Sequence, residues 1–212
     1  KMEREGATSI MVAGAMLPES HYDQNERAKN AIDDTKFSGD YVRWGIYSKA
    51  GEVWGNDPSM TATNIKVIGN QVEGGRYGIS FISVSGGKTG DQYSNQIKDN
   101  YITETTRTIA LQNNNSGVEI SGNVLTDYLS TGVLLGYNTD NNMVANNIIQ
   151  SVNFQGQSAI QINTGSENNL VKGNRIDQTL APGKEGGWLV YAGAEVSNTR
   201  IVDNVIAGEA KK

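Results

Sequence analysis

The sequence predicts an all-β protein built as a parallel β-helix, a solenoid of about eight coils with three short strands in each coil. Three observations predict this fold. A short motif recurs along the 212-residue chain, the apolar residues come in short alternating groups, and 25 glycines stand against three prolines. A unit repeated this often is typical of stacked repeats, in which each coil buries its apolar side against its neighbours.

The repeat is marked by an asparagine between two short apolar groups. The motif is clearest in VEISGNVL and recurs as IKVIGN, IKDNYI, VANNII, VKGNRI and IVDNVI. The aligned residues are Asn70, Asn100, Asn123, Asn147, Asn174 and Asn204, at spacings of 30, 23, 24, 27 and 30 residues. Two weaker copies precede them, with Asp40 in FSGDYV and Ala15 in MVAGAM.

Each repeat divides into three short strands. In residues 117–142 the expected strands cover 117–120, 124–125 and 132–135, and their apolar residues alternate as β-strands require. The third strand is expected again at 45–48, 78–81, 109–111, 159–162 and 188–190. At about 4.8 Å per stacked strand, eight coils predict a rod roughly 38 Å long.

The corner between the first and second strands explains the recurring asparagine. A corner of one or two residues needs a left-handed backbone conformation, which glycine and asparagine tolerate best. The pairs Gly-Asn and Asp-Asn occupy this position repeatedly. Stacked asparagine side chains can also hydrogen-bond to one another along the rod. We therefore expect this asparagine ladder to belong to the scaffold and not to a functional site.

The xIxGNxI…GIxL coil resembles the right-handed β-helix repeat of the pectate-lyase-like superfamily, with the asparagine at its tight second turn. The resemblance covers nearly the whole chain. It implies a right-handed β-helix that binds extended polysaccharide along the outer face of the third strands, as phage tailspikes and polysaccharide depolymerases do. The superfamily also contains lyases, glycoside hydrolases, uronate epimerases and non-enzymatic surface proteins, so the fold alone does not identify the function.

The outer face of the third strands is expected to carry no charged side chains. The residues predicted to point inward are Ile46, Ile79, Ile109, Val133, Ile160 and Trp188. The residues predicted to point outward are then Tyr47, Ser80, Ala110, Leu134, Gln161 and Leu189. None of these outward residues is charged, which predicts either a plain surface or one that is covered.

Candidate site residues gather in the N-terminal third, near the long loops at 18–26 and 49–63. The catalytic candidates are His21, Tyr22, Asp23, Arg27, Asp33 and Asp34, and the substrate-binding candidates are Arg43, Trp44, Tyr47 and Trp54. In a lyase, Tyr22 or His21 would remove a proton while an arginine held the uronate carboxylate. In a hydrolase, two carboxylates would act as acid and base, and the aromatic side chains would stack on sugar rings.

Plainer explanations exist for the same residues. A lone histidine in a polar loop is commonly part of the surface, and aspartates such as Asp33 and Asp34 are common in turns. No Asp-Pro-His triplet or calcium-binding nonapeptide repeat is present, so no cofactor or metal is expected, although acidic side chains could bind calcium. SGGKTG, residues 85–90, lacks the spacing of a phosphate loop and is predicted to form a turn.

Charge and composition limit the partners. A net charge of −5 without a basic cluster argues against nucleic acid, and the absence of a long apolar run argues against a membrane span. We expect a single domain over residues 1–212, part of a longer polypeptide, outside the cell or on a virion surface. The expected partner is a polysaccharide, and a homotrimer would cover outward apolar residues.

Two classes of function remain open from the sequence. The first is a carbohydrate-active β-helix that binds and cleaves an acidic bacterial polysaccharide, as a lyase or a glycoside hydrolase. The second is a non-catalytic β-helical shaft or adhesin segment, and a uronate epimerase is a further alternative.

Overall fold

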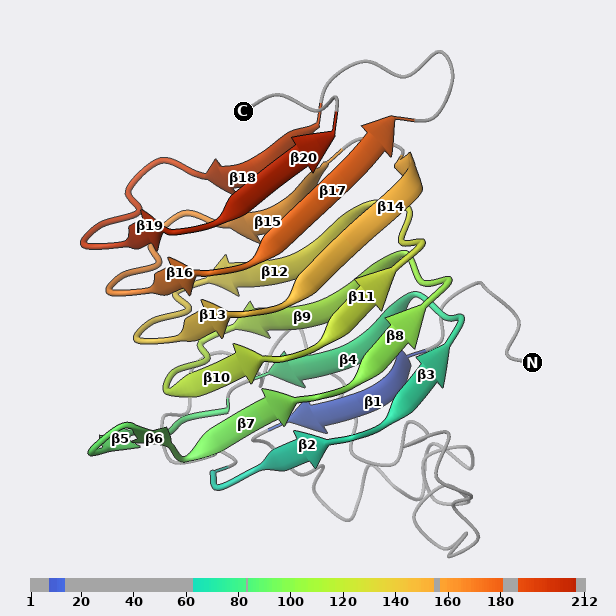
Figure 1. The fold of residues 1–212 in the computed structure, drawn as a ribbon. Coiled ribbons are helices and arrows are strands. Elements are labelled where there is room, and N and C mark those ends of the chain that lie inside the picture. The colour runs from blue at the N-terminus through green and yellow to red at the C-terminus, as the bar shows by residue number, and fades with distance from the viewer. Residues whose placement is uncertain (1–7, 14–62, 83, 155–156, 181–186, 209–212) are drawn as a thin grey trace, which may run out of the picture.

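A computed structural model describes residues 8–13, 63–82, 84–154, 157–180 and 187–208. These residues form three six-stranded sheets, in which every pair of neighbouring strands is parallel, and one small antiparallel hairpin (Figure 1). No helix occurs among them. The predicted all-β parallel β-helix is confirmed.

The strands of each sheet come from successive coils. Sheet 1 contains β2 (Lys66–Ile68), β7 (Asn95–Lys98), β10 (Val118–Ser121), β13 (Met143–Ala145), β16 (Leu170–Lys172) and β19 (Arg200–Val202). Sheet 2 contains β3 (Gln71–Glu73), β8 (Tyr101–Thr103), β11 (Val124–Thr126), β14 (Ile148–Phe154), β17 (Arg175–Leu180) and β20 (Val205–Gly208). Sheet 3 contains β1 (Thr8–Ala13), β4 (Tyr77–Ile82), β9 (Arg107–Asn113), β12 (Thr131–Tyr137), β15 (Ser158–Ile162) and β18 (Trp188–Ala192).

The chain passes through sheets 1, 2 and 3 in turn. The described residues hold five complete coils, followed by the two strands β19 and β20 of a sixth. This is fewer than the eight coils predicted. In Figure 1 sheets 1 and 2 face the viewer, and sheet 3 lies behind them.

Strand β1 corrects the interpretation of the N-terminal repeats. The segment around Ala15 was predicted to form the corner between first and second strands, but β1 lies in sheet 3 and pairs directly with β4, with Ile10 beside Ile79. β1 therefore occupies the place beside β4 that was predicted for residues 45–48. Those residues, and the weak repeat around Asp40, lie outside the described part of the chain.

The core is a set of columns of stacked aliphatic residues. In each sheet, inward residues at matching positions of successive strands stack on one another, and these side chains are almost fully buried. Sheet 1 supplies Ile97, Ile120, Val144 and Val171; sheet 2 supplies Ile102, Leu125, Ile149 and Ile176; sheet 3 supplies Ile79, Ile109, Val133 and Ile160. The branched residues suit both the extended backbone and the burial, so the period-2 pattern of the sequence becomes the core.

The asparagine ladder is present between sheets 1 and 2. Asn123 donates from its side-chain amide to Oδ1 of Asn147 at 2.9 Å and to the Ile97 carbonyl oxygen at 2.9 Å. The same pattern joins the six aligned asparagines, Asn70, Asn100, Asn123, Asn147, Asn174 and Asn204. Their interactions make this row a scaffold, as predicted.

The left-handed residue at this corner is not the ladder asparagine. It is the residue before it, with φ angles between 54° and 70°. These residues are Gly69, Asp99, Gly122, Asn146, Gly173 and Asp203. The two requirements assigned to one asparagine are thus divided between neighbours: the first residue makes the bend, and the second makes the ladder.

A second asparagine column lies at the start of the strands of sheet 1. Asn142 donates from Nδ2 to Oδ1 of Asn169 at 3.1 Å, and the same Oδ1 accepts the Asn142 backbone N–H at 3.0 Å. Oδ1 of Asn95 accepts the backbone N–H of Ile65 in the same way. All three asparagines are buried. The sequence motif did not reveal this column, because asparagine does not occur there in every coil.

The segment SGGKTG, predicted to form a turn, supplies one strand and the first turn residue of a small hairpin. The hairpin pairs β5 (Lys88–Thr89) with β6 (Gln92–Tyr93), and Gly90 lies in its turn at φ 60°. Lys88 lies 3.5 Å from an Asp91 carboxylate oxygen and also faces the ring of Tyr93. The hairpin projects beside β7 in Figure 1.

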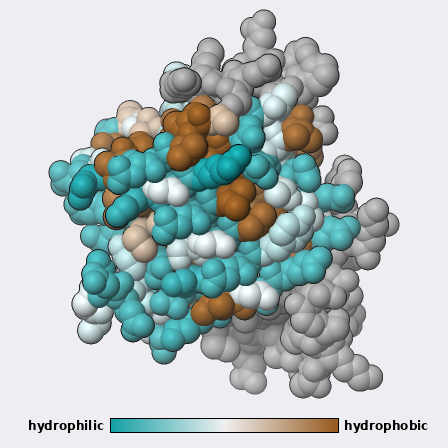
Figure 2. Space-filling view, in the orientation of Figure 1, coloured by the Kyte–Doolittle hydropathy of each residue, from teal (hydrophilic) through white to brown (hydrophobic). Residues whose placement is uncertain are grey.

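The face formed by sheets 1 and 2 is largely hydrophilic. Figure 2 shows hydrophobic side chains as separate patches between hydrophilic ones, not as one continuous surface. Among the described residues no helix is long and apolar enough to cross a membrane.

Candidate functional site

All ten site residues predicted from the sequence lie outside the described part of the chain. These are His21, Tyr22, Asp23, Arg27, Asp33, Asp34, Arg43, Trp44, Tyr47 and Trp54. Their roles stay predictions, and the site described below is built from other residues.

The outer face of sheet 3 differs from the predicted row at its C-terminal end. Trp188 was expected to point inward and Leu189 outward, but Trp188 is 43% exposed and Leu189 is 1% exposed within the core. The register explains the error: Trp188 lies beside Ser158, and Val190, not Trp188, lies beside Ile160. The rest of the predicted outward row is uncharged, and Ser80, Ala110 and Leu134 are buried.

A second row on the outer face of sheet 3 was missed by the sequence analysis. It consists of the first residues of the five sheet 3 strands β4, β9, β12, β15 and β18. The row contains Tyr77, Arg107, Thr131, Ser158 and Trp188, which lie side by side in the strand register. The row carries an aromatic residue at each end and a cationic residue next to the first.

Two arginines flank Tyr77 in this row. The guanidinium carbon of Arg107 lies 5.7 Å from the centre of the Tyr77 ring, and that of Arg76 lies 5.4 Å from it. Arg107 also donates from Nη1 to the Tyr77 hydroxyl at 3.1 Å. Such contacts hold a guanidinium over a ring while leaving other N–H groups available. We call Arg76, Tyr77 and Arg107 the arginine–tyrosine cluster.

The cluster is linked to the next coils through polar side chains. Arg107 donates from Nη2 to Oε1 of Gln157 at 3.4 Å, and the Thr131 hydroxyl donates to the same oxygen at 3.1 Å. Nε of Arg107 is buried and has no hydrogen-bond partner. The salt bridges among the described residues, Lys88–Asp91 and Lys98–Glu119, involve neither arginine of the cluster. Two positive charges are therefore left without a carboxylate among the described residues.

The far end of the row carries two aromatic rings. Trp188 and Tyr191 lie 6.4 Å apart between ring centres, with their planes tilted by 49°. Both are partly exposed, at 43% and 38%. Exposed rings that are held by neighbouring side chains provide flat apolar surfaces of the kind on which sugar rings stack.

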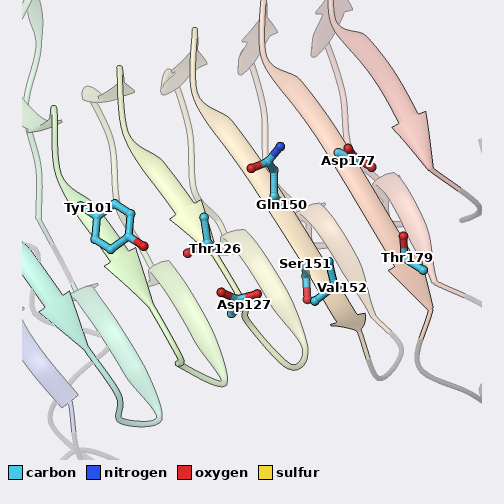
Figure 3. A pocket seen from close by; sticks show the side chains of 8 residues that line it. All are labelled: Tyr101, Thr126, Asp127, Gln150, Ser151, Val152, Asp177 and Thr179. Atoms are coloured by element: carbon cyan, nitrogen blue, oxygen red, sulfur yellow. The ribbon is translucent and has the colours of Figure 1, made fainter.

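A groove of about 300 Å³ lies on a different face, over sheet 2 (Figure 3). It crosses the four strands β8, β11, β14 and β17. The groove is lined by Tyr101, Thr126, Asp127, Gln150, Ser151, Val152, Asp177 and Thr179. Thr126, Gln150 and Asp177 stand side by side in the register of three successive strands. No sequence motif marked these residues, because they are outward positions at which any polar residue is tolerated.

Metal ligands are sparse in the part of the chain that the structure describes. No group of three His, Cys, Asp or Glu side chains that could hold a metal ion occurs there. The full sequence contains no cysteine and one histidine, His21, which lies outside the described residues.

The fold defines a parallel β-helical solenoid with three long outer faces. The chain belongs to the NosD family, whose model, described as periplasmic copper-binding protein (NosD), matches residues 51–211. No curated protein and no solved structure matches the chain. The family match supports the β-helix expected from the pectate-lyase-like resemblance, while the tailspike or depolymerase type belongs to the proposals below.

The copper in the family description does not fit the described residues. Protein sites for copper are built mainly from His, Cys and Met side chains. Of these types, the described side chains include Met143 alone. We therefore derive no copper chemistry for this part of the chain.

Proposed function

We propose that this protein is a carbohydrate-active β-helix that binds an acidic bacterial polysaccharide along the outer face of sheet 3. The observation that carries the proposal is the arginine–tyrosine cluster, in which Arg76 and Arg107 flank one ring without a carboxylate partner among the described residues.

The cluster favours an anionic ligand group. A guanidinium presents its N–H donors in a planar fork that matches a carboxylate or a sulfate, and such charge-assisted hydrogen bonds are about twice as strong as neutral ones. The whole chain has a net charge of −5. Attraction of a polyanion must therefore come from a local site, and two adjacent arginines on one face provide it.

The arrangement also favours an extended ligand. The row from Tyr77 to Trp188 crosses five strands, which at about 4.8 Å per strand is roughly 19 Å along the rod. Aromatic side chains stand at both ends, and the exposed Gln157 lies between them, while Thr131 and Ser158 are buried beneath the surface. A polysaccharide lying along the rod would stack on the rings and place an acidic group at the arginines.

Cleavage of the bound polymer is the second part of the proposal. The acid, base or proton-abstracting groups would come from the N-terminal candidates, among them His21, Tyr22 and Asp23, which lie outside the described residues. The alternative is a non-catalytic shaft that binds polysaccharide without cleaving it. In either case the family description supports a location in the periplasm or outside the cell.

Binding is tested with Arg76→Gln and Arg107→Gln, using Arg200→Gln on sheet 1 as the matched control. Affinity electrophoresis in gels containing alginate, polygalacturonate or a bacterial capsular polymer should retard the wild type and the control. Each cluster variant should bind at least 10-fold more weakly, and the retardation should weaken with salt because Arg76 is exposed and Arg107 is partly exposed to solvent. Arg76 is exposed, so Arg76→Gln tests the site even if Arg107→Gln folds poorly.

Cleavage is read in parallel on the same polymers. Absorbance at the unsaturated-uronate band reports a lyase, and new reducing ends without that absorbance report a hydrolase. Binding without either product supports the non-catalytic shaft. Equal retardation of the wild type and both cluster variants would refute the proposed binding face.

A further inference from the structure

The groove over sheet 2 is a second surface with the properties of a ligand site. It lies across β8, β11, β14 and β17, on a different sheet from the arginine–tyrosine cluster. Its eight lining residues include an aromatic ring, an amide, hydroxyls and two carboxylates, and no lysine, arginine or histidine. A concave surface that combines an apolar platform with a few convergent polar groups is typical of a small-ligand subsite.

Two exposed side chains with apolar surface line the groove, one on β8 and one on β14. Tyr101 is 42% exposed and Val152 is 62% exposed, although both lie within strands of the sheet. Figure 3 shows Tyr101 on the strand at one side of the groove and Val152 two strands away. A tyrosine held on a strand loses little conformational freedom when it stacks on a ligand, because its side chain has only two rotatable angles.

The polar groups of the groove are available for a ligand. Gln150, Asp127 and Asp177 make no side-chain hydrogen bond or ion pair with another described residue. Thr126 and Ser151, in contrast, are already engaged, through Thr103 and the carbonyl oxygen of Tyr128. The amide can both donate and accept, whereas the two carboxylates can only accept at neutral pH.

We propose that this groove binds a saccharide segment that carries no acidic group. The ring of Tyr101 stacks on one face of a sugar, and the sugar hydroxyls donate to Asp127 and Asp177 while Gln150 satisfies the remaining donors and acceptors. Hydroxyl groups that donate to carboxylates form charge-assisted hydrogen bonds, which are stronger than neutral ones.

The charge of the groove separates its ligand from that of sheet 3. The groove has two carboxylates and no cationic side chain among its lining residues, which disfavours a uronate or a sulfated sugar. Like charges repel, and no opposite charge compensates for removing the ligand charge from water. The inference does not depend on the proposed function: the sheet 3 face would take acidic units, and the groove would take uncharged or amine-bearing units. A polymer that contains both kinds of unit would contact both faces.

The test uses defined hexasaccharides that differ in charge. Isothermal titration calorimetry is run with hexamers of glucose, mannose, N-acetylglucosamine, glucosamine and galacturonate, and with a hexalysine peptide. Wild-type protein should bind at least one of the four non-acidic hexamers, and Tyr101→Ala and Asp177→Asn should each weaken that binding at least 10-fold. Two control variants should leave the binding of that hexamer unchanged. They are Tyr137→Ala, at another exposed tyrosine, and Asp203→Asn, at a corner where Asn146 occupies the equivalent place.

Each other outcome overturns the inference. Binding of the galacturonate hexamer that is lost in Asp177→Asn would show that the groove takes acidic sugars. Hexalysine bound as tightly as the best saccharide would show a general cation site. Failure of all four non-acidic hexamers to bind, or binding that both groove variants retain, would show that the groove is not a saccharide site. Retained acidic-polymer binding in Tyr101→Ala separates this result from failure of the sheet 3 proposal.

Discussion

Oδ1 of Asn147 accepts two hydrogen bonds from Asn123 one coil earlier, from its side-chain Nδ2 at 2.9 Å and from its backbone N–H at 3.0 Å. Asn123 in turn accepts the same pair from Asn100. Each of the four inner ladder asparagines, Asn100, Asn123, Asn147 and Asn174, therefore joins three coils, and its amide satisfies buried backbone and side-chain groups that water cannot reach.

Asn123→Leu should destabilise the solenoid by several kcal/mol. The substitution removes the acceptor of the Asn100 backbone N–H, one of the two acceptors of Asn100 Nδ2, and the side-chain donor to the Ile97 carbonyl oxygen, at about 1–3 kcal/mol for each buried group left unsatisfied. Urea unfolding followed by circular dichroism measures the change. Asn113→Leu, at an exposed position at the end of β9, is the control and should cost little. Equal midpoints for the two variants would mean that the ladder does not stabilise the fold.

Gly69→Ala isolates the cost of the left-handed corner. Gly69 has φ 70°, and no other atom lies within 4 Å of the place that a Cβ would occupy. The expected loss of about 1–2 kcal/mol is therefore backbone strain alone. Gly69→Asn should lose less, because Asn146 adopts this conformation at the equivalent corner.

Gly87→Ala provides the matched control for this measurement. It too has no atom within 4 Å of a Cβ, but its φ lies outside the left-handed region, so the variant should unfold like the wild type. If Gly69→Ala is as stable as Gly87→Ala, the division of roles at the corner is wrong.

Much of the fold could be predicted because the same residue types recur at equivalent positions of successive coils. The Gly-Asn and Asp-Asn pairs, the stacked Ile, Val and Leu columns and the three strands of each coil all follow from local rules. The N-terminal coils could not be predicted from the weak repeats. β1 pairs directly with β4 although about 60 residues of chain separate them, and no local rule reports so distant a partner.

The site on sheet 3 could not be predicted, because strict alternation fails where its strands begin. Leu189 and Val190 are consecutive residues, yet both pack in or against the core. In the same way, a Cβ on Gly78 would lie 2.5 Å from Cγ2 of the core residue Ile102, beside the inward residue Ile79. Two successive inward residues shift the outward row by one position, which hid Arg107 and Trp188 from a period-2 analysis.

The predicted catalytic residues are tested by alanine substitution in the full chain. If the protein cleaves polysaccharide, at least one of His21→Ala, Tyr22→Ala, Asp23→Ala and Asp33→Ala should lower the rate at least 100-fold, because general acid–base groups contribute about 10²–10⁴. Single-turnover assays on the polymer bound by the wild type measure the rate, and circular dichroism checks the fold. Asp91→Ala, in the β5–β6 hairpin, is the control. Wild-type turnover in all four variants would place the catalytic groups elsewhere.

Tyr128 should make the stability of the solenoid depend on pH in the alkaline range. Its hydroxyl accepts a hydrogen bond from Gln178 Nε2 at 2.6 Å, and burial in the core raises the pKa of Tyr128 well above its usual range. The unfolded chain ionises this tyrosine near pH 10, whereas the folded protein keeps it neutral. The contribution is therefore fully present below about pH 10 and is lost as pH rises from there toward the folded pKa, by about 1.4 kcal/mol per pH unit.

Comparison of the wild type with Tyr128→Phe tests this linkage. At neutral pH the variant should be less stable by about 1–3 kcal/mol, because Gln178 Nε2 loses its acceptor inside the core. Above pH 10 the gap should narrow, since phenylalanine cannot ionise in the unfolded chain. Tyr137→Phe, at a tyrosine that is 57% exposed, should show neither effect. Denaturant midpoints measured at half-unit pH intervals give the result. If the stability difference between the wild type and Tyr128→Phe stays constant through pH 11, Tyr128 ionises as readily in the folded protein as in the unfolded chain.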